Sequence, residues 1–571
     1  MSNLEPLLES LIKRLRLGPR RLEAVMQSVP LGQGFSERLA RALRLRVDLP
    51  PAELDRLPPK GPLLLCCNRP YGLLEACALW PKLRERRPDL LVLEDALMEA
   101  GGEPATLAPG GYFERLAAAE RHLAQGGAVL ALVGRSLGRG RLDSAGDKAE
   151  ARSLARLARQ ASAGVQVIHL TGGRRRRWLR AFGLDKPGLR RLALSPAFGG
   201  LGPRLEARLG TVLQPQRLQA MPQEADAAEL LALRIWLLAH RGRLVASSST
   251  WTQRLRLWRQ RPLASPLPPE LLERELEALP AGALLAMSGE LECWVAEAAQ
   301  IPSLLREIGR LREETFRAVG EGTGQPVDLD RFDQHYTHLF LWQRRQRRVV
   351  GAYRFTPMDR ALGRFGLEGL YTHTLLRFKP ELLNELDPAL ELGRSFVVAE
   401  FQRSYAPLLL LWKGLGAWVA AHPRYRRLFG VVSMSAEYQP LSRELVASFI
   451  KQHLYRGDLA RLTRPRRPYA PAYAASKHDP LTWRLGARLE EMSDWVAELE
   501  PDGKGMPVLF RQYAKLGGVF FGFNVDPAFG DALDGLVSVD LLKTDERMLA
   551  RTMGAEAAAR FLGWHQSRAA R

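Results

Sequence analysis

The segment Glu391-Leu392-Gly393-Arg394 combines a carboxylate and a guanidinium within an otherwise apolar stretch. A carboxylate can take a proton from an amine, directly or through water, while the amine attacks an electrophile. An arginine three residues later can pair with the carboxylate of a substrate or with the glutamate itself. Glu391 and Arg394 are therefore candidate catalytic residues, and the alternative is a structural ion pair under a sheet.

A second candidate is the turn at residues 402–407, which comes directly before an apolar stretch expected to form a helix. The first N–H groups of a helix have no partner within the helix, and the helix dipole favours an anion there. Gln402, Arg403 and Ser404 are therefore candidates for binding an anion such as a phosphate group.

The elements that would position these residues alternate between short apolar segments and amphipathic ones, which is typical of α/β domains. In the first half we expect strands at 63–67, 129–133 and 165–170 and a helix at 112–125. In the second half we expect helices at 302–316 and 407–421 and strands at 339–342, 349–355, 391–398, 428–433, 519–523 and 537–541.

With 571 residues the chain is too long for one hydrophobic core. A basic amphipathic pattern predicts a helical extension within residues 1–45. Consecutive prolines interrupt the periodicity and predict a Pro-rich linker at 261–282. We therefore expect an α/β domain at 46–260 and an α+β domain at 283–571.

The second half resembles ornithine N-acyltransferases and autoinducer-synthase-like proteins, both in the GNAT superfamily. The resemblance rests on residues 308–317, 320–324, 328–333, 351–355, 391–397 and 524–527, among others, and extends over nearly all of the chain after about residue 284. It implies a GNAT-like α+β domain with a splayed mixed sheet and Glu391-x-x-Arg394 as a family element.

The same resemblance adds binding candidates. Arg312, Arg317, Asp330 and Asp333 match its pattern, either as substrate or carrier contacts or as a network that orders the first loop. Ser433, at the end of an expected strand, is added to this group. Because Ala406 and Leu408 stand where coenzyme A-binding members have glycines, the resemblance favours an acyl carrier protein thioester as donor, with no bound cofactor.

In the first half, residues 68–75 resemble the first block of glycerolipid acyltransferases of the hemolysin-like branch. There a histidine and an acidic residue form a dyad that deprotonates the attacking hydroxyl. Arg69 stands at the histidine position and Glu75 at the acidic position. A guanidinium stays protonated at physiological pH, so Arg69 is no general base. This domain is expected to keep the fold and to have lost the chemistry.

The chain is strongly basic, with 83 Lys and Arg against 62 Asp and Glu, a net charge of +21 and a pI near 10.2. Such a surface suits nucleic acid, an anionic membrane surface or an acidic acyl carrier protein. No aromatic-interleaved basic motif of a nucleic-acid reader is present, so nucleic acid is not expected.

The four cysteines have neither CxxC spacing nor a partner set of histidines, which argues against a metal site and a disulfide framework. We expect them to be reduced and buried. The apolar runs are too short for a transmembrane helix and the start lacks a signal-peptide pattern. A cytoplasmic protein bound peripherally to the inner membrane is the expectation.

Together these features predict transfer of a 3-hydroxyacyl chain from acyl carrier protein to the α-amino group of ornithine, giving a lyso-ornithine lipid. The order of the halves also resembles bifunctional ornithine lipid synthases. Lysine, glutamine and glycine stay open as acceptors. The alternatives are a lysolipid O-acyltransferase working through the first half, which Arg69 opposes, and a non-catalytic lipid-binding adaptor.

Overall fold

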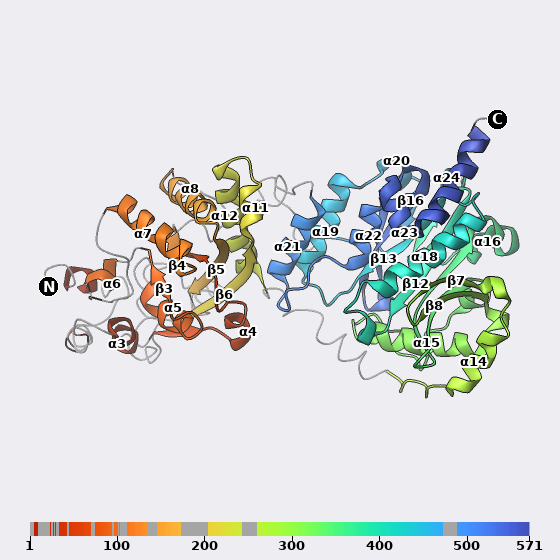
Figure 1. Ribbon diagram of the computed structural model, residues 1–571, viewed down its shortest axis with the longest axis horizontal. Helices are drawn as coiled ribbons and strands as arrows, with labels where there is room; N and C mark the ends of the chain where they lie inside the picture. Colours follow the sequence, from red (N-terminus) through yellow and green to blue (C-terminus); the bar gives the residue numbers. More distant parts are fainter. Residues whose placement is uncertain are drawn as a thin grey trace. The chain divides into compact units, whose positions relative to one another are not determined.

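The computed structural model describes residues 5–9, 34–42, 45–69, 75–93, 96–100, 111–133, 145–172, 204–241, 260–471 and 488–569, with a few single positions before 34 and at 102. The chain forms two compact units (Figure 1). Unit 1 comprises Met1–Arg241 together with Ala497–Lys504, and unit 2 comprises Gly242–Val496 and Gly505–Arg571. Each unit combines a sheet with helices, so the α/β expectation is confirmed.

Unit 1 is built on a six-stranded sheet in which all neighbours run parallel except β5 and β6. Its central strands read as continuous apolar runs because helices cover both faces. The strand order is β1 (Arg46–Asp48), β6 (Arg204–Leu213), β5 (Gly164–Gly172), β2 (Leu63–Asn68), β4 (Ala128–Val133) and β3 (Leu90–Val92).

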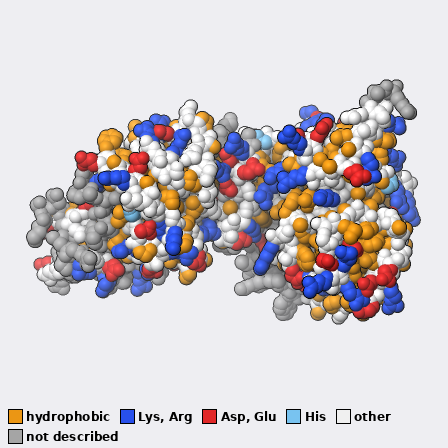
Figure 2. Space-filling model, in the orientation of Figure 1, with side chains coloured by type: hydrophobic (Ala, Val, Ile, Leu, Met, Phe, Trp, Pro, Cys, Tyr) orange, Lys and Arg blue, Asp and Glu red, His pale blue; other side chains and the backbone are white. Residues whose placement is uncertain are grey.

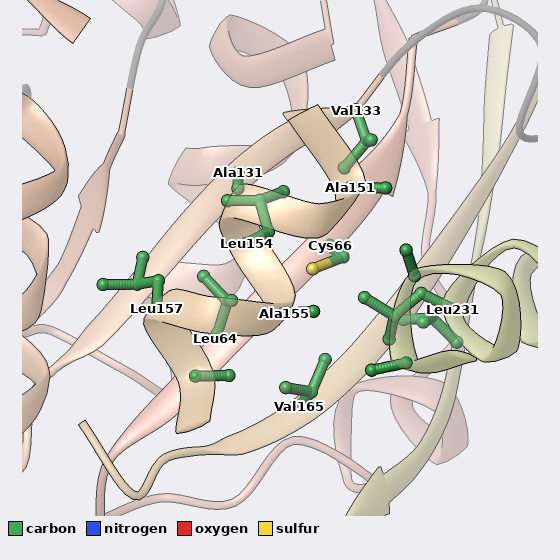
Figure 3. Close-up of a cluster of buried hydrophobic side chains, with 14 of the residues drawn as sticks. Leu64, Cys66, Ala131, Val133, Ala151, Leu154, Ala155, Leu157, Val165 and Leu231 are labelled. Atoms are coloured by element: carbon green, nitrogen blue, oxygen red, sulfur yellow. The ribbon is translucent and has the colours of Figure 1, made fainter. Parts of the chain in front are cut away.

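Alternate residues of β2 point to opposite faces of this sheet. Leu63, Leu65 and Cys67 join one core cluster, which includes buried residues of α3 (Phe35–Ala42) and α5 (Glu75–Arg84). Leu64 and Cys66 join the other, together with residues of α7 (Tyr112–Ala124), α8 (Ala145–Gln160) and α12 (Glu224–His240) (Figure 3). The two-residue period of a strand thus divides one apolar run between two cores.

The cysteines behave as small buried hydrophobes, as expected. All four are free and buried. Burial raises the pKa of the Cys66 thiol to about 12 and also raises the pKa of Cys293. These thiols therefore stay neutral at physiological pH.

Unit 2 is built on an eight-stranded sheet in which β12 and β13 are the parallel pair and the other neighbours are antiparallel. Helix α15 (Pro302–Arg317) packs on β10 and β12, and α18 (Ala406–Ala421) packs on β7, β8 and β9. The strand order is β15 (Val519–Asp526), β16 (Ala532–Asp540), β13 (Arg427–Met434), β12 (Ala389–Val397), β10 (Arg348–Pro357), β9 (Thr337–Gln343), β8 (Leu291–Glu297) and β7 (Leu284–Ser288).

Unit 2 also contains a second, smaller sheet and several further helices (Figure 1). A small second sheet pairs β11 (Leu376–Phe378) with β14 (Thr463–Pro465). Helix α18 also packs against α23 (Glu546–Met553) and α24 (Ala555–Ala569), while α19 (Pro440–His453) follows β13. No helix among the described residues is both long and apolar enough to cross a membrane.

The stretch expected to be a Pro-rich linker differs from that expectation. Residues 269–277 form helix α14 (Pro269–Glu277), in which Leu272 and Leu276 are buried one turn apart. A proline at the first helical position does not disturb a helix, because its missing N–H would have no partner there. Of the expected N-terminal amphipathic helix, residues 5–9 are helical and most of the remainder lies outside the described residues.

Candidate active site

The central strands β12 and β13 run side by side only at their beginnings. They pair in parallel from Ala389 opposite Arg427 to Leu392 opposite Gly430, where the register ends. At this last pair a Cβ on Gly430 would lie 2.3 Å from the carbonyl oxygen of Leu392, so only glycine allows so close an approach. Beyond it the strands separate, because β12 continues beside β10 and β13 continues beside β16.

One face of β12 is uncovered at the point where the strands separate. A Cβ on Gly393 would meet no atom within 4 Å, although this residue lies on a central strand of a wide sheet. Ser395 on β12 and Val431 and Ser433 on β13 are only half-buried. We call this region the β12–β13 opening. Its walls carry unpaired strand edges, to which an extended ligand can hydrogen-bond.

A β-bulge places Arg394 at the start of the opening. Ala352 on β10 lies opposite Phe396 and Arg354 lies opposite Gly393, so two steps on β10 match three on β12. Arg394 itself has a φ of 56°, in the left-handed region that non-glycine residues rarely occupy. Bulges of this kind redirect a side chain and are frequent beside active sites.

Three arginines and three aspartates form a buried ion network beside the bulge. Arg312, on α15, places its Nε 2.8 Å from Asp328 Oδ2 and its Nη2 2.9 Å from Asp333 Oδ2. Arg354, on β10, donates to both carboxylate oxygens of Asp330, at 2.7 and 2.8 Å, and lies 2.9 Å from Asp333. Each of these two arginines is therefore held by two carboxylates.

Arg394 is the third arginine of the network and the one at the opening. Its Nη2 lies 3.3 Å from Asp330 Oδ2 and its Nε 3.6 Å from Asp328 Oδ2. The guanidinium carbon also lies 4.0 Å from the ring centre of Phe529 and 4.9 Å from that of Tyr371. These contacts fix the side chain from several sides.

The network is charged, and its charges balance. Burial alone would raise the pKa of Asp333, but Arg312 and Arg354 hold it well below its usual value. Burial would also raise the pKa of Asp330, but the charge and hydrogen bonds of Arg354 lower it below its usual value. Three carboxylates thus face three guanidinium groups.

Four candidates from the sequence meet in this network: Arg312, Asp330, Asp333 and Arg394. Its remaining members, Asp328 and Arg354, had not been predicted as site residues. The signal for Arg354 is a charged residue inside an apolar strand, where it needs a buried partner. No sequence spacing shows which partner that is.

Glu391 lies on β12 before the opening and is fully buried. Its carboxylate accepts hydrogen bonds from the Tyr336 hydroxyl, from the backbone N–H of Thr372 at 2.7 Å and from that of Tyr371 at 3.1 Å. Burial raises the pKa of Glu391, against the lowering effect of the Thr372 and Tyr336 hydrogen bonds. Glu391 therefore holds the backbone at Tyr371, whose ring contacts Arg394.

Arg317 lies outside the network, although it is on the same helix as Arg312. Its Nε donates to Glu313 Oε1 at 2.7 Å, and its other nitrogens donate to the backbone carbonyls of Arg261 and Gln325. Glu313 in turn accepts from the backbone N–H of Gly324 at 2.7 Å. This pair orders the loop that follows α15.

The turn before α18 is exposed at residues 402–406, at the end of the segment that follows β12. Gln402 Nε2 donates to the Val397 carbonyl at 2.7 Å, and Ser404 Oγ accepts from the backbone N–H of Ala406 at 3.2 Å. Arg403 is exposed. Basic and polar groups therefore surround the start of a 16-residue helix.

Ser433 leads to a set of carboxylates that the sequence analysis missed. Its Oγ donates to Asp534 Oδ1 at 2.8 Å, whereas Asp534 Oδ2 is buried and has no hydrogen-bond partner in the part of the chain that the structure describes. Burial, and then the negative charge of Asp526, raises the pKa of Asp534 well above its usual value. The negative charge of Glu321, in the loop after α15, also raises the pKa of Asp534. We call Glu321, Asp526 and Asp534 the acidic trio.

The acidic trio gives a pH-dependent stability. Burial, followed by the charges of Glu437 and Asp526 and against that of Arg394, raises the pKa of Glu321 from 4.5 to about 7. The folded protein thus holds this proton more tightly than the unfolded chain, so stability is lost as the pH rises from 4.5 towards 7.

We expect the free energy of unfolding to fall by about 1–3 kcal/mol more over this range in the wild type than in Glu321→Gln. Hydrogen exchange at the amides of β15 and β16, converted to opening free energies for both proteins at pH 5 and 7.5, measures the difference within unit 2. Parallel pH curves for the two proteins would contradict the assignment.

In unit 1, the predicted dyad positions lie at the end of β2 and the start of α5. Arg69 follows β2, Glu75 is buried at the first position of α5, and residues 70–74 between them are outside the described residues. The pKa of the nearby Cys67 thiol is raised, mainly by burial. The charge of Glu75 raises this pKa further, and the charge of Arg69 lowers it. Asn68 ties β2 to β5 through two hydrogen bonds with the Leu170 backbone, at 3.0 and 2.6 Å.

The fold and the opening of unit 2 define an acyltransferase of the GNAT class. Residues 311–413 match the family described as "Acetyltransferase (GNAT) domain". This range runs from α15 through the bulged strand β12 into α18, and so includes one side of the opening and the turn before α18.

Curated relatives narrow the class. The chain is 31% identical over 262 residues to a glycine Nα-acyltransferase of Bacteroides thetaiotaomicron, which covers 43% of this chain and 77% of that protein. It is 30% identical over 272 residues to a glycine Nα-acyltransferase of Phocaeicola vulgatus, covering 45% and 82%. No solved structure matches. The chain therefore belongs to the family of GNAT-domain N-acyltransferases that these proteins represent.

Proposed function

We propose that unit 2 transfers a 3-hydroxyacyl chain from acyl carrier protein to the α-amino group of ornithine, forming lyso-ornithine lipid in membrane lipid biosynthesis. The observation that carries the proposal is the β12–β13 opening, which has Arg394 on its wall and a helix N-terminus after β12. The glycine acceptor named for the relatives is the alternative within the same reaction.

The donor arm would enter between the separated strands. Strand edges beyond Gly393 can hydrogen-bond its amides, and the open space at Gly393 leaves room for the thioester. Its phosphate would lie at the start of α18, near Arg403 and Ser404, where helix N–H groups favour an anion.

In the transfer, the neutral amine nitrogen attacks the thioester carbonyl. A C–N bond forms, the C–S bond breaks, the amine gives up a proton and the departing thiolate gains one. Arg394 is our candidate for pairing with the carboxylate of the acceptor, since guanidinium and carboxylate match in geometry. Its contacts with Tyr371 and Phe529 would hold it in place for this role.

For Glu391 the contacts favour a positioning role through Tyr371, because three donors already occupy its carboxylate. The sequence-based role, direct proton acceptance, stays a prediction. Gln at this position can still accept from the Thr372 N–H through its one carbonyl oxygen, and its NH2 can donate to the Tyr336 hydroxyl, but it cannot take a proton. Glu391→Gln therefore distinguishes the two roles.

The basic surface suits an acidic carrier protein and an anionic membrane. Lys and Arg side chains lie on the visible face of each unit, with acidic ones between them (Figure 2). Complementary charge would speed association with the carrier. We further propose that unit 1 binds membrane, lipid or a partner without turnover, because Arg69 cannot act as a base.

Expression in a host that lacks aminolipids, followed by lipid mass spectrometry, tests the proposed function. We expect a new mono-acylated ornithine in cells with the wild type and its loss with Glu391→Ala. Glu391→Gln should retain about a tenth or more of the product if Glu391 positions Tyr371, and none if it takes the proton. Acylated lysolipids without any N-acyl amino acid would instead favour O-acyl transfer by unit 1.

A further inference from the structure

We propose that the acidic trio Glu321, Asp526 and Asp534 binds the side-chain ammonium group of the acceptor, so that unit 2 selects a diamino acid over glycine. The inference rests on the proposed N-acyl transfer and adds to it a binding site that would select the acceptor. Ornithine and lysine both fit this class.

The three carboxylates come from different elements. Asn524, two residues before Asp526, lies opposite Asp534 in the register of β15 and β16, and the charge of Asp526 acts on both Asp534 and Glu321. Asp526 ends β15, Asp534 lies on β16, and Glu321 lies in the loop after α15. Asp534 is opposite Ser433 in the register of β13 and β16, and its side chain is hydrogen-bonded to Ser433. Since Ser433 lines the β13 wall, the acidic trio adjoins the place where an acceptor must lie.

Asp534 has an unused acceptor atom. The residue is 2% exposed, and Ser433 occupies Oδ1 while Oδ2 has no partner among the described residues. A buried polar atom without a partner is costly, and it usually marks a position that a ligand or water completes. An ammonium group is a fitting partner for this oxygen, because it offers three donors and a positive charge.

The charges around the trio are not balanced. The positive charge of Arg394 stabilises the ionised forms of both Glu321 and Asp534. Arg394, however, already contacts the carboxylates of Asp328 and Asp330. Arg443 also acts on Asp534, but its guanidinium donates to the carbonyl of Asp531. Glu437 adds a further carboxylate next to Gly320. Burying such a set favours either protons or a cationic ligand.

The reaction chemistry decides which amino group that cation is. The α-amine must be neutral when it attacks the thioester, so it cannot balance the carboxylates at that moment. A second ammonium group, on the acceptor side chain, keeps its charge throughout the reaction. Glycine has no such group, whereas ornithine and lysine have one. With Arg394 on the acceptor carboxylate, the trio would hold the opposite end of the molecule.

Calorimetric titration of the full-length protein, in the presence of holo acyl carrier protein, tests the site independently of turnover. The ligands are L-ornithine, L-lysine and glycine, and the variant is Asp534→Asn. This variant resembles the protonated aspartate in shape, so it should fold. The matched control is Asp531→Asn. Asp531 is exposed in the connection just before β16, and asparagine tolerates its positive φ.

We expect the wild type to bind ornithine at least about tenfold more tightly than glycine. Asp534→Asn should bind ornithine at least about tenfold more weakly than the wild type does. Asp531→Asn should bind as the wild type does. Equal binding of glycine and ornithine, unchanged binding in Asp534→Asn, or no amino-acid binding at all would overturn the proposal. N-acyl transfer to glycine alone would overturn it while leaving N-acyl transfer itself in place, whereas ornithine binding without any transfer would overturn the proposed function instead.

Discussion

Gly393→Leu is expected to reduce acyl transfer at least about a hundredfold while the protein keeps its fold. A Cβ added at this position would meet no atom within 4 Å, so a larger side chain can leave the backbone here without a clash. It would, however, fill the space in which the thioester must meet the amine, and small misplacements of reacting groups cost about this much. Initial rates with an acyl carrier protein thioester and ornithine measure the effect.

The matched control for this prediction is Gly363→Leu. Gly363 lies on α16 (Met358–Phe365), is exposed, and also has no atom within 4 Å of an added Cβ. We expect near wild-type rates for it. Normal activity of Gly393→Leu would show that the acyl chain does not pass through the β12–β13 opening.

Arg354→Met is expected to destabilise unit 2 by about 3–5 kcal/mol, since it leaves Asp330 and Asp333 short of a buried partner. Two units need not unfold in one transition, so hydrogen exchange at the amides of β10 and β12 is the suitable measurement. The network also holds Arg394, and acyl transfer should therefore fall together with stability.

Arg348→Met serves as the control on the same strand. Arg348 forms an exposed ion pair with Glu400, and exposed pairs contribute little. We expect unchanged exchange rates for this variant. If Arg354→Met exchanged as slowly as the wild type, the network would not be what fixes the bulge at Arg394.

The local elements of this protein follow from sequence patterns. The apolar runs at 63–67 and 428–433 correspond to β2 and β13, and the expected helix at 302–316 corresponds to α15, because burial on a sheet or helix face leaves a periodic signal. The stretch at 261–282 was interpreted as a linker because its prolines outweighed the helical spacing of Leu272 and Leu276.

No sequence pattern indicates that Ala497–Lys504 belongs to unit 1, although the residues before and after this segment belong to unit 2. Glu498 in that segment accepts hydrogen bonds from the Arg234 side chain and from the Thr211 backbone N–H. A buried carboxylate needs such partners, but they lie more than 250 residues away in sequence. Sequence spacing carries no information on pairs so distant.

The candidate site shows the same division. Residue types and spacing indicated that Glu391 and Arg394 could do chemistry, because charged groups in an apolar segment need a reason to be there. The resemblance to ornithine N-acyltransferases added Arg312, Asp330 and Asp333. Tertiary structure alone decided which of them meet. It placed Arg394 on a bulge between separating strands, gave the Glu391 carboxylate its donors, and brought the acidic trio together from a loop and two strands. Hydrogen bonding and electrostatic interaction depend on distance in space, which the order of residues along the chain does not specify.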